Sequence, residues 1–170
     1  MFTLEICDNR IDDDGDGKID CFDGECDGGV ICWKCDEDYY QLRSNSKLGA
    51  LNPGPGAYYT VADIIGASQI NGTQMSHYDG HVYAPCIIDG NHTLGLLKQD
   101  GTVVDMGLDL PTSSIFYVGG LDVDGKLYMS RGSGSIYYVD LTQAELTVEC
   151  TSASATGVAD FAVDNTNGLF

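Results

Sequence analysis

The chain has 170 residues, and 43% of them are hydrophobic, which is enough to bury a core in one domain or in a small module joined to a larger one. Its formal net charge of −18 argues against nucleic acid, which needs a basic face, and against an anionic membrane surface, and it favours divalent cations. No apolar run has the length of a membrane span, and residues 1–6 lack the pattern of a signal peptide, so an exported protein would have this chain as a mature form or a fragment.

Residues 1–38 form the first compositional unit, which is acidic and rich in cysteine and glycine. They hold 13 Asp and Glu residues against 3 Lys and Arg residues, and five of the seven cysteines lie between Cys7 and Cys35. Such crowding is typical of disulfides in an oxidising compartment or of a metal cluster. We therefore predict a cysteine-rich calcium-binding module over residues 1–38 and a separate β-repeat domain over residues 39–170.

Residues 12–23 match the pattern of a calcium loop. Carboxylates recur at alternate positions, Gly17 allows the sharp bend, and Ile19 anchors the loop to apolar surface. The last position is Asp23 rather than Glu, which predicts a modest affinity suited to the calcium concentration outside cells. The predicted ligands of this structural Ca²⁺ are the side chains of Asp12, Asp14, Asp16, Asp20 and Asp23 and the backbone carbonyl of Lys18; a second ion could use Asp23, Glu25 and Asp27.

The residues before the loop narrow the choice of family. Residues 7–10 have a turn-like rather than a helical pattern, which excludes a paired EF-hand. The stretch from Cys7 to Cys21 resembles thrombospondin type 3 calcium repeats, and it resembles more closely the C-D-N-x-I-D-D-D-G-D-G-x-I-D-C modules of secreted bacterial surface proteins. Arg10 stands where that pattern often has Gly. The resemblance implies an extracellular, calcium-stabilised and disulfide-bonded stalk or spacer.

The cysteines admit more than one chemistry. The candidates for disulfide bonds are Cys7, Cys21, Cys26, Cys32, Cys35, Cys86 and Cys150. A zinc site would use Cys21, Cys26, Cys32 and Cys35, although the spacing of the first pair is looser than in a usual zinc knuckle. A redox role for the CxxC pair lacks the βαβ context that such motifs have. Because seven is odd, one cysteine is free or pairs elsewhere, and Cys86 and Cys150 could pair with each other.

Residues 39–170 have the pattern of short antiparallel strands. Apolar runs at 58–61, 115–118, 126–129, 136–139 and 146–150 are separated by Asp-Gly and Asn-Gly turns. A hairpin around a glycine recurs at 77–84, 122–129 and 163–170, and an outer hairpin recurs at 48–61, 94–106 and 136–149. The spacing of roughly 40–48 residues is that of a propeller blade. These units resemble the blades of bacterial surface β-propellers.

The expected fold is therefore mainly β: a small disulfide-rich calcium-loop module plus an incomplete β-propeller-like array of antiparallel four-stranded blades. About three blades fit into the chain, and closed propellers have at least four, so the array is truncated or is completed by another chain. Unpaired strand edges are templates for pairing. The expected partners are other copies of the chain or other surface proteins.

Two sequons make Asn71 and Asn91 candidates for N-glycosylation in a source with that machinery. Catalysis finds little support, because the sequence has neither a nucleophile elbow nor a phosphate loop. His77 and His81 flank a turn and are expected to face solvent. We therefore expect no enzymatic activity.

These features favour an extracellular or cell-surface structural or adhesive glycoprotein that is stabilised by calcium and disulfides, with a filament or matrix as its setting. A glycan-binding propeller module is the first alternative, and exposed aromatic rings around one concave site would support it. A propeller-type hydrolase or lyase is the second alternative, and it needs converging carboxylates or histidines.

Overall fold

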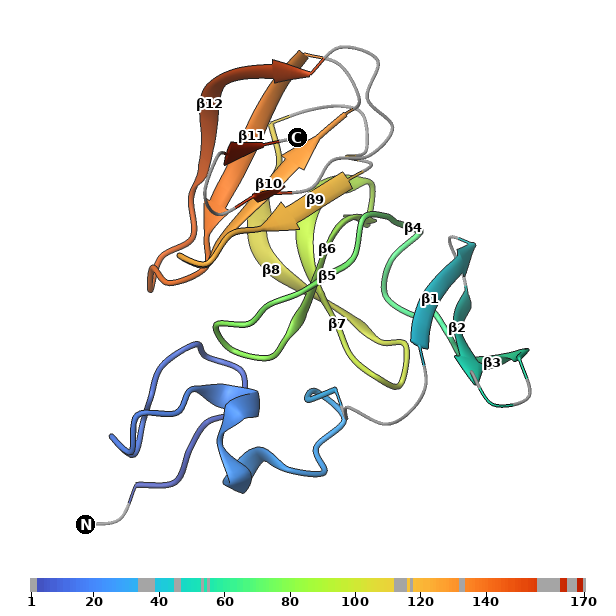
Figure 1. Cartoon of the computed structure of the whole chain (residues 1–170), viewed down its shortest axis with the longest axis vertical. Helices are drawn as coiled ribbons and strands as arrows, with labels where there is room; N and C mark the ends of the chain where they lie inside the picture. Colours follow the sequence, from blue (N-terminus) through green and yellow to red (C-terminus); the bar gives the residue numbers. More distant parts are fainter. Residues whose placement is uncertain are drawn as a thin grey trace.

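The fold is known from a computed structural model, which describes residues 3–33, 39–44, 47–52, 54, 56–111, 116, 118–131, 134–155, 163–164 and 168–169. A small N-terminal module lies against three antiparallel sheets, and a two-stranded ribbon follows near the C-terminus (Figure 1). Over these ranges no helix is long and apolar enough to cross a membrane.

The module contains two short 3-10 helices, η1 (Asp20–Phe22) and η2 (Gly24–Cys26). The first sheet has β1 (Tyr39–Ser44), β2 (Lys47–Asn52) and β3 (Ala57–Asp63). The second has β4 (Gln69–Ile70), β5 (Gln74–Met75), β6 (Val82–Ile88), β7 (Asn91–Leu97) and β8 (Val103–Asp109). The third has β9 (Val118–Leu121), β10 (Lys126–Ser130), β11 (Gly134–Asp140) and β12 (Val148–Ala155), and the ribbon has β13 (Val163–Asp164) and β14 (Gly168–Leu169).

The recurring hairpins of the sequence are the hairpins of the structure. The outer units form the pairs β2–β3, β7–β8 and β11–β12. The glycine-centred units join β5 to β6, β9 to β10 and β13 to β14. The third sheet has the four strands expected of a blade, whereas the first sheet has three within the described ranges. The prediction of a mainly β, propeller-like array of antiparallel sheets is confirmed.

The innermost strand of the second sheet is split into β4 and β5, which both pair with β6. Pro85 lies in β6 opposite the break. The backbone N–H of Asn71 donates to the carbonyl of Pro85 at 3.1 Å, so the nitrogen of Pro85 faces the same inner strand. Because proline has no N–H, the return hydrogen bond from Pro85 cannot form, and the regular ladder is interrupted between β4 and β5.

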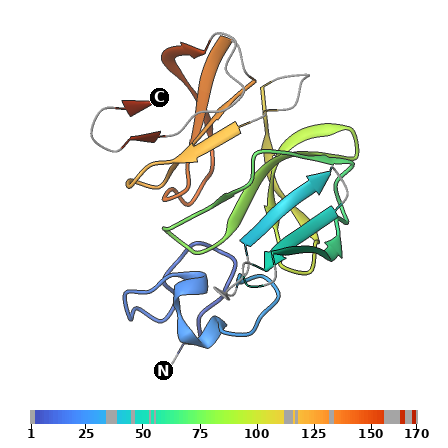
Figure 2. The same cartoon turned by 45° about the vertical axis from the view of Figure 1, so that its right-hand side comes forward.

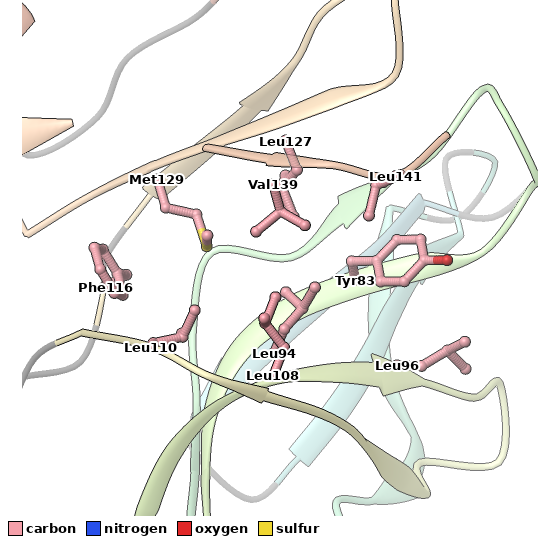
Figure 3. Close-up of a cluster of buried hydrophobic side chains, with 10 residues drawn as sticks. All are labelled: Tyr83, Leu94, Leu96, Leu108, Leu110, Phe116, Leu127, Met129, Val139 and Leu141. Carbon is pink, nitrogen blue, oxygen red and sulfur yellow. The ribbon is translucent and has the colours of Figure 1, made fainter. Parts of the chain in front are cut away.

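The second sheet lies between the other two, and both of its faces are buried (Figures 1 and 2). Toward the third sheet, Tyr83 and Leu94 pack with Phe116 and Met129 in one core cluster, drawn in Figure 3. Toward the first sheet, alternate residues of β6 pack against Leu48 in a second cluster. Burial of one such large side chain stabilises the fold by about 1.5–3 kcal/mol. This explains why β6 and the second half of β7 are apolar and buried, whereas β3, at the outer edge of the first sheet, is mostly exposed.

Candidate metal centre and its attachment to the sheets

The loop over residues 12–17 is shaped by aspartates that accept hydrogen bonds from its own backbone. Oδ1 and Oδ2 of Asp12 accept from the N–H groups of Gly15 and Gly17, at 2.6 and 2.9 Å. Asp14 accepts from the N–H of Asp16 at 2.9 Å. Gly17 has a φ of 92°, in the region that glycine adopts without steric cost, as the sharp bend requires. These hydrogen bonds hold the side chains of Asp12 and Asp14 against the backbone of the same short loop.

These carboxylates form two groups that share Asp14. Within each group the candidate ligand oxygens lie within 4.8 Å of one another; the groups are Glu5, Asp12 and Asp14, and Asp14, Asp16 and Asp23. The backbone N–H of Asp16 lowers the pKa of Asp14, but burial and the neighbouring carboxylates outweigh this effect and raise that pKa above its ordinary value. A cation would relieve this repulsion.

Asp23 supplies the sharpest test of whether a cation fits. The side chain is 4% exposed, and its Oδ1 accepts from the N–H of Glu25 at 2.6 Å as the N-cap of η2. Its Oδ2 is buried without a hydrogen-bond partner among the described residues. An unpaired buried carboxylate oxygen is costly unless a cation neutralises it. The donors are oxygens only, and such a set suits a hard ion such as Ca²⁺.

Glu5 belongs to this centre although the loop pattern does not include it. The side chain is buried, and its two oxygens accept from the N–H groups of Asp13 and Asp20, each at 2.9 Å. An acidic residue just before Cys7 was the only signal in the sequence. Glu25 and Asp27, proposed for a second ion, lie in neither carboxylate group; Glu25 instead accepts from the N–H of Glu5 at 3.0 Å.

Asp20 lies outside both groups and faces the sheets, so the structure places it away from the ligand set predicted for it. The side chain is 0% exposed, and its oxygens accept from the N–H groups of Asn9 and Arg10 at 3.2 and 2.9 Å. Lys18 is exposed and pairs through its ammonium with Asp16 at 3.3 Å. The predicted role of the Lys18 carbonyl stays a prediction.

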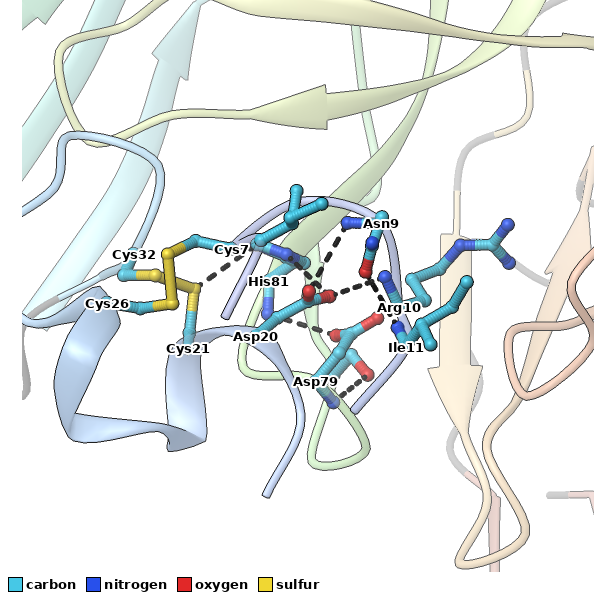
Figure 4. A network of polar contacts seen from close by, with 12 residues as sticks. Cys7, Asn9, Arg10, Ile11, Asp20, Cys21, Cys26, Cys32, Asp79 and His81 are labelled. Atoms are coloured by element: carbon cyan, nitrogen blue, oxygen red, sulfur yellow. Dashed lines mark hydrogen bonds and ion pairs between the residues drawn. A yellow bond between two sulfur atoms is a disulfide. The ribbon is translucent and has the colours of Figure 1, made fainter. Parts of the chain in front are cut away.

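His81 joins the module to the second sheet, which corrects the expectation that it faces solvent. Its ring is 0% exposed, with Nε2 3.2 Å from Oδ2 of Asp20 and Nδ1 3.4 Å from Sγ of Cys21 (Figure 4). Its backbone N–H donates to Asp79, which also accepts from the hydroxyl of Tyr83 at 2.7 Å. The turn pattern around His81 was correct, but it could not reveal a module packed against the turn. His77, in the same turn, is exposed as expected.

Cys21 and Arg10 make further contacts that fix the N-terminal module on the second and third sheets. The N–H of Cys21 donates to the carbonyl of Asp79 at 3.1 Å, and a Cβ at Gly80 would lie 2.8 Å from that of Cys21. The guanidinium of Arg10 donates to the carbonyls of Leu141, Gln143 and Ala144, at 3.3, 2.8 and 3.0 Å. Arg10 has a φ of 64°, in the left-handed region that favours glycine.

Four of the cysteines form two disulfides, Cys7–Cys26 and Cys21–Cys32. The zinc alternative is therefore wrong, because three of its four thiols are oxidised; Cys35 lies outside the described residues. Cys86 and Cys150 are free thiols, so the possible bond between them is not formed. Cys86 is buried, and this burial, followed by the nearby charge of Asp105, raises its pKa to about 12.

The two sequon asparagines differ in access. Asn71 is partly buried between β4 and β5, whereas Asn91 is exposed at the start of β7. Glycosylation of either residue stays a prediction.

No family model and no curated protein matches this sequence. Among solved structures, a gluconolactonase from Xanthomonas campestris is similar, with 20% sequence identity and a TM-score of 0.47. The match covers 73% of this chain and 40% of that one. Because this similar protein is an enzyme, the expectation of a chain without enzymatic activity is withdrawn. A likeness at this level transfers no activity to the present chain.

Proposed function

We propose that the loop over residues 12–23 holds a calcium ion, which stabilises the N-terminal module and fixes it on the sheets of an extracellular protein. The observation that carries this proposal is the buried Oδ2 of Asp23, which lacks a hydrogen-bond partner in the described part of the chain; the Asp23 carboxylate belongs to one group with Asp14 and Asp16. The residues that would hold the ion are Asp12, Asp14, Asp16 and Asp23, the carbonyl of Lys18 and, from before the loop, Glu5.

The bound ion would supply the positive charge that lets these carboxylates lie close together. Glu5 then connects the centre to the sheets. Its carboxylate accepts a hydrogen bond from the backbone N–H of Asp20, and the side chain of Asp20 contacts His81 on the second sheet. Binding of calcium and docking of the module would therefore stabilise each other. This role is structural, since over residues 3–33, which the structure describes, the loop has no paired helices that could move as in a calcium sensor.

The proposal includes the expected setting. Two disulfides are typical of an oxidising compartment, and the resemblance to thrombospondin type 3 repeats implies a module outside the cell. A structural or adhesive role, as part of a surface filament or matrix, would use open strand edges. Over the described residues, β1 and β3 each pair with β2 alone, which leaves two such edges on the first sheet.

Thermal unfolding at increasing calcium concentration tests the proposal. Free calcium at a hundredfold excess over its dissociation constant should stabilise the folded state by about 2.7 kcal/mol. Asp23→Asn should lose most of this effect. Asp8→Asn is the matched control, since Asp8 is exposed and lies outside both carboxylate groups, and it should keep the full response. An unfolding midpoint that calcium and a chelator leave unchanged in the wild type would contradict the proposal.

A propeller-type hydrolase or lyase is the second candidate. It needs converging carboxylates and histidines, and the described residues bring Asp20, Asp79 and His81 together. All three side chains are buried, so a substrate would need the module to move. Hydrolysis of gluconolactone is a direct assay, chosen because the similar solved structure carries that activity in its name. A rate equal to that of buffer would remove the lactonase form of this candidate.

A further inference from the structure

Two cavities adjoin where the N-terminal module meets the first and second sheets. The smaller, of about 210 Å³, lies between Trp33, β1 with β2, and β5 with β6. The larger, of about 620 Å³, lies along the Cys21–Cys32 disulfide and Phe22. Trp33 and Met75 line both cavities, so together they form one cleft that these two side chains divide.

Two contacts orient Trp33 at this division. Its indole Nε1–H donates to the carbonyl of Leu97 at 2.8 Å. Its ring meets that of Tyr40 edge to face, with centroids 5.0 Å apart and planes at 83°. A ligand would therefore meet aromatic walls that are already in place, and it would lose little free energy in ordering them.

The charge of the lining restricts the class of ligand. The chain carries a net charge of −18, yet none of the described residues that line the smaller cavity is charged. Its polar groups include the amide of Gln41 and the hydroxyls of Thr73 and Tyr40, set among apolar groups, and the Tyr40 hydroxyl already accepts from Gln99. The larger cavity adds a carboxylate, Asp27, which can accept hydrogen bonds from hydroxyl groups. An apolar wall with a few polar groups suits a neutral, ring-shaped and hydroxylated ligand.

We propose that this cleft binds a neutral carbohydrate, with one sugar ring in the smaller cavity and the next units in the larger cavity beside Phe22. The C–H groups on one face of a pyranose ring are weakly positive, and they are attracted to the negative face of an aromatic ring. Gln41, Thr73 and Asp27 bind the hydroxyl groups at the ring edge. This proposal does not depend on a calcium ion in the loop.

The chain contains a single tryptophan, so its intrinsic fluorescence reports directly on the cleft. An array of neutral glycans should show binding, and titration with the strongest of them should change the fluorescence of Trp33 in a saturable way. Phe22→Ala and Met75→Ala remove side chains that are 49% and 41% exposed, and each should weaken binding about tenfold while the protein stays folded. Tyr39→Ala, an exposed aromatic residue outside both linings, is the matched control and should bind like the wild type.

Circular dichroism and the unfolding midpoint confirm that each variant is folded, and Gln41→Ala replaces any variant that is not. The proposal is overturned if no neutral glycan on the array binds. It is equally overturned if the variants bind as tightly as the wild type, or if indole gives a saturable response while the glycans give none.

Discussion

Asp20 and His81 are 61 positions apart in the chain, and Oδ2 of the first lies 3.2 Å from Nε2 of the second with neither side chain exposed. Through this contact the acidic module is attached to the turn between β5 and β6. Because polar groups this deeply buried are costly when they lose their partners, the pair makes docking specific.

His81→Leu should lower the free energy of unfolding by about 1–3 kcal/mol, because it leaves the buried carboxylate of Asp20 without one of its partners. Chemical denaturation monitored by circular dichroism measures this change. His77→Leu alters an exposed residue of the same turn, and its effect should stay within about 0.5 kcal/mol. Equal effects of the two substitutions would show that the buried contact is not formed.

Two substitutions at Arg10 distinguish the contribution of its side-chain hydrogen bonds to stability from the cost of its left-handed backbone. Arg10→Gly and Arg10→Ala both remove the three hydrogen bonds to the turn between β11 and β12. At a φ of 64° only alanine retains the cost of the left-handed conformation, so Arg10→Ala should be less stable than Arg10→Gly by about 1 kcal/mol. Denaturation curves of the two variants, measured side by side, test this order. The reverse order would mean that the backbone at this position is not left-handed.

Gly80 and Gly90 form a matched pair, since both have a left-handed φ, of 76° and 85°. A Cβ at Gly80 would lie 2.8 Å from that of Cys21, whereas one at Gly90 meets nothing within 4 Å. Gly90→Ala should therefore cost about 1–2 kcal/mol from backbone strain alone. Gly80→Ala should cost more and should expose the module to limited proteolysis. Similar stabilities and digestion patterns would argue against the close approach of the turn to the disulfide.

Cys86 and Cys150, the free thiols among the described residues, should differ strongly in reactivity. Cys150 is exposed, whereas Cys86 is buried, donates to the carbonyl of Thr93 and has a pKa raised to about 12. Because the thiolate is the reactive form, a maleimide at neutral pH should label Cys150 rapidly and leave Cys86 unmodified until the protein unfolds. Peptide mass mapping before and after denaturation identifies the labelled residue. Rapid labelling of Cys86 in the native protein would contradict its burial.

The parts of this fold that depend on neighbouring residues could be predicted from the sequence. Asp-Gly turns fix hairpins locally, so the turns at Gly80 and Gly125 and the strands beside them were found. The loop over residues 12–17 could be predicted for the same reason, since its aspartates accept hydrogen bonds from the backbone of the loop itself, whereas its calcium ion stays a proposal. Pro85 lies opposite the split of the inner strand. A proline interrupts only the pairing with the strand that its nitrogen faces, and this strand is known only once the strands are paired.

Contacts between distant segments could not be predicted. Asp20 fits the spacing of a calcium ligand, and only the position of His81 shows that it faces the sheets. Glu5 has no place in a twelve-residue pattern, because it reaches the centre from a preceding segment. Pairing of Cys86 with Cys150 was plausible by count alone, and it failed because one thiol lies in the core while the other is exposed.

The two disulfides overlap along the chain, since the second begins at Cys21, inside the loop that Cys7 and Cys26 close. Under a pulling force, the shortest covalent path from Cys7 to Cys32 crosses both bridges, with Cα–Cα distances of 5.6 and 5.2 Å, and only the few peptide units between Cys21 and Cys26. Its contour length is under about 30 Å, whereas the same segment without bridges extends to about 85 Å. Even when its hydrogen bonds have ruptured, the module therefore behaves as a nearly inextensible link.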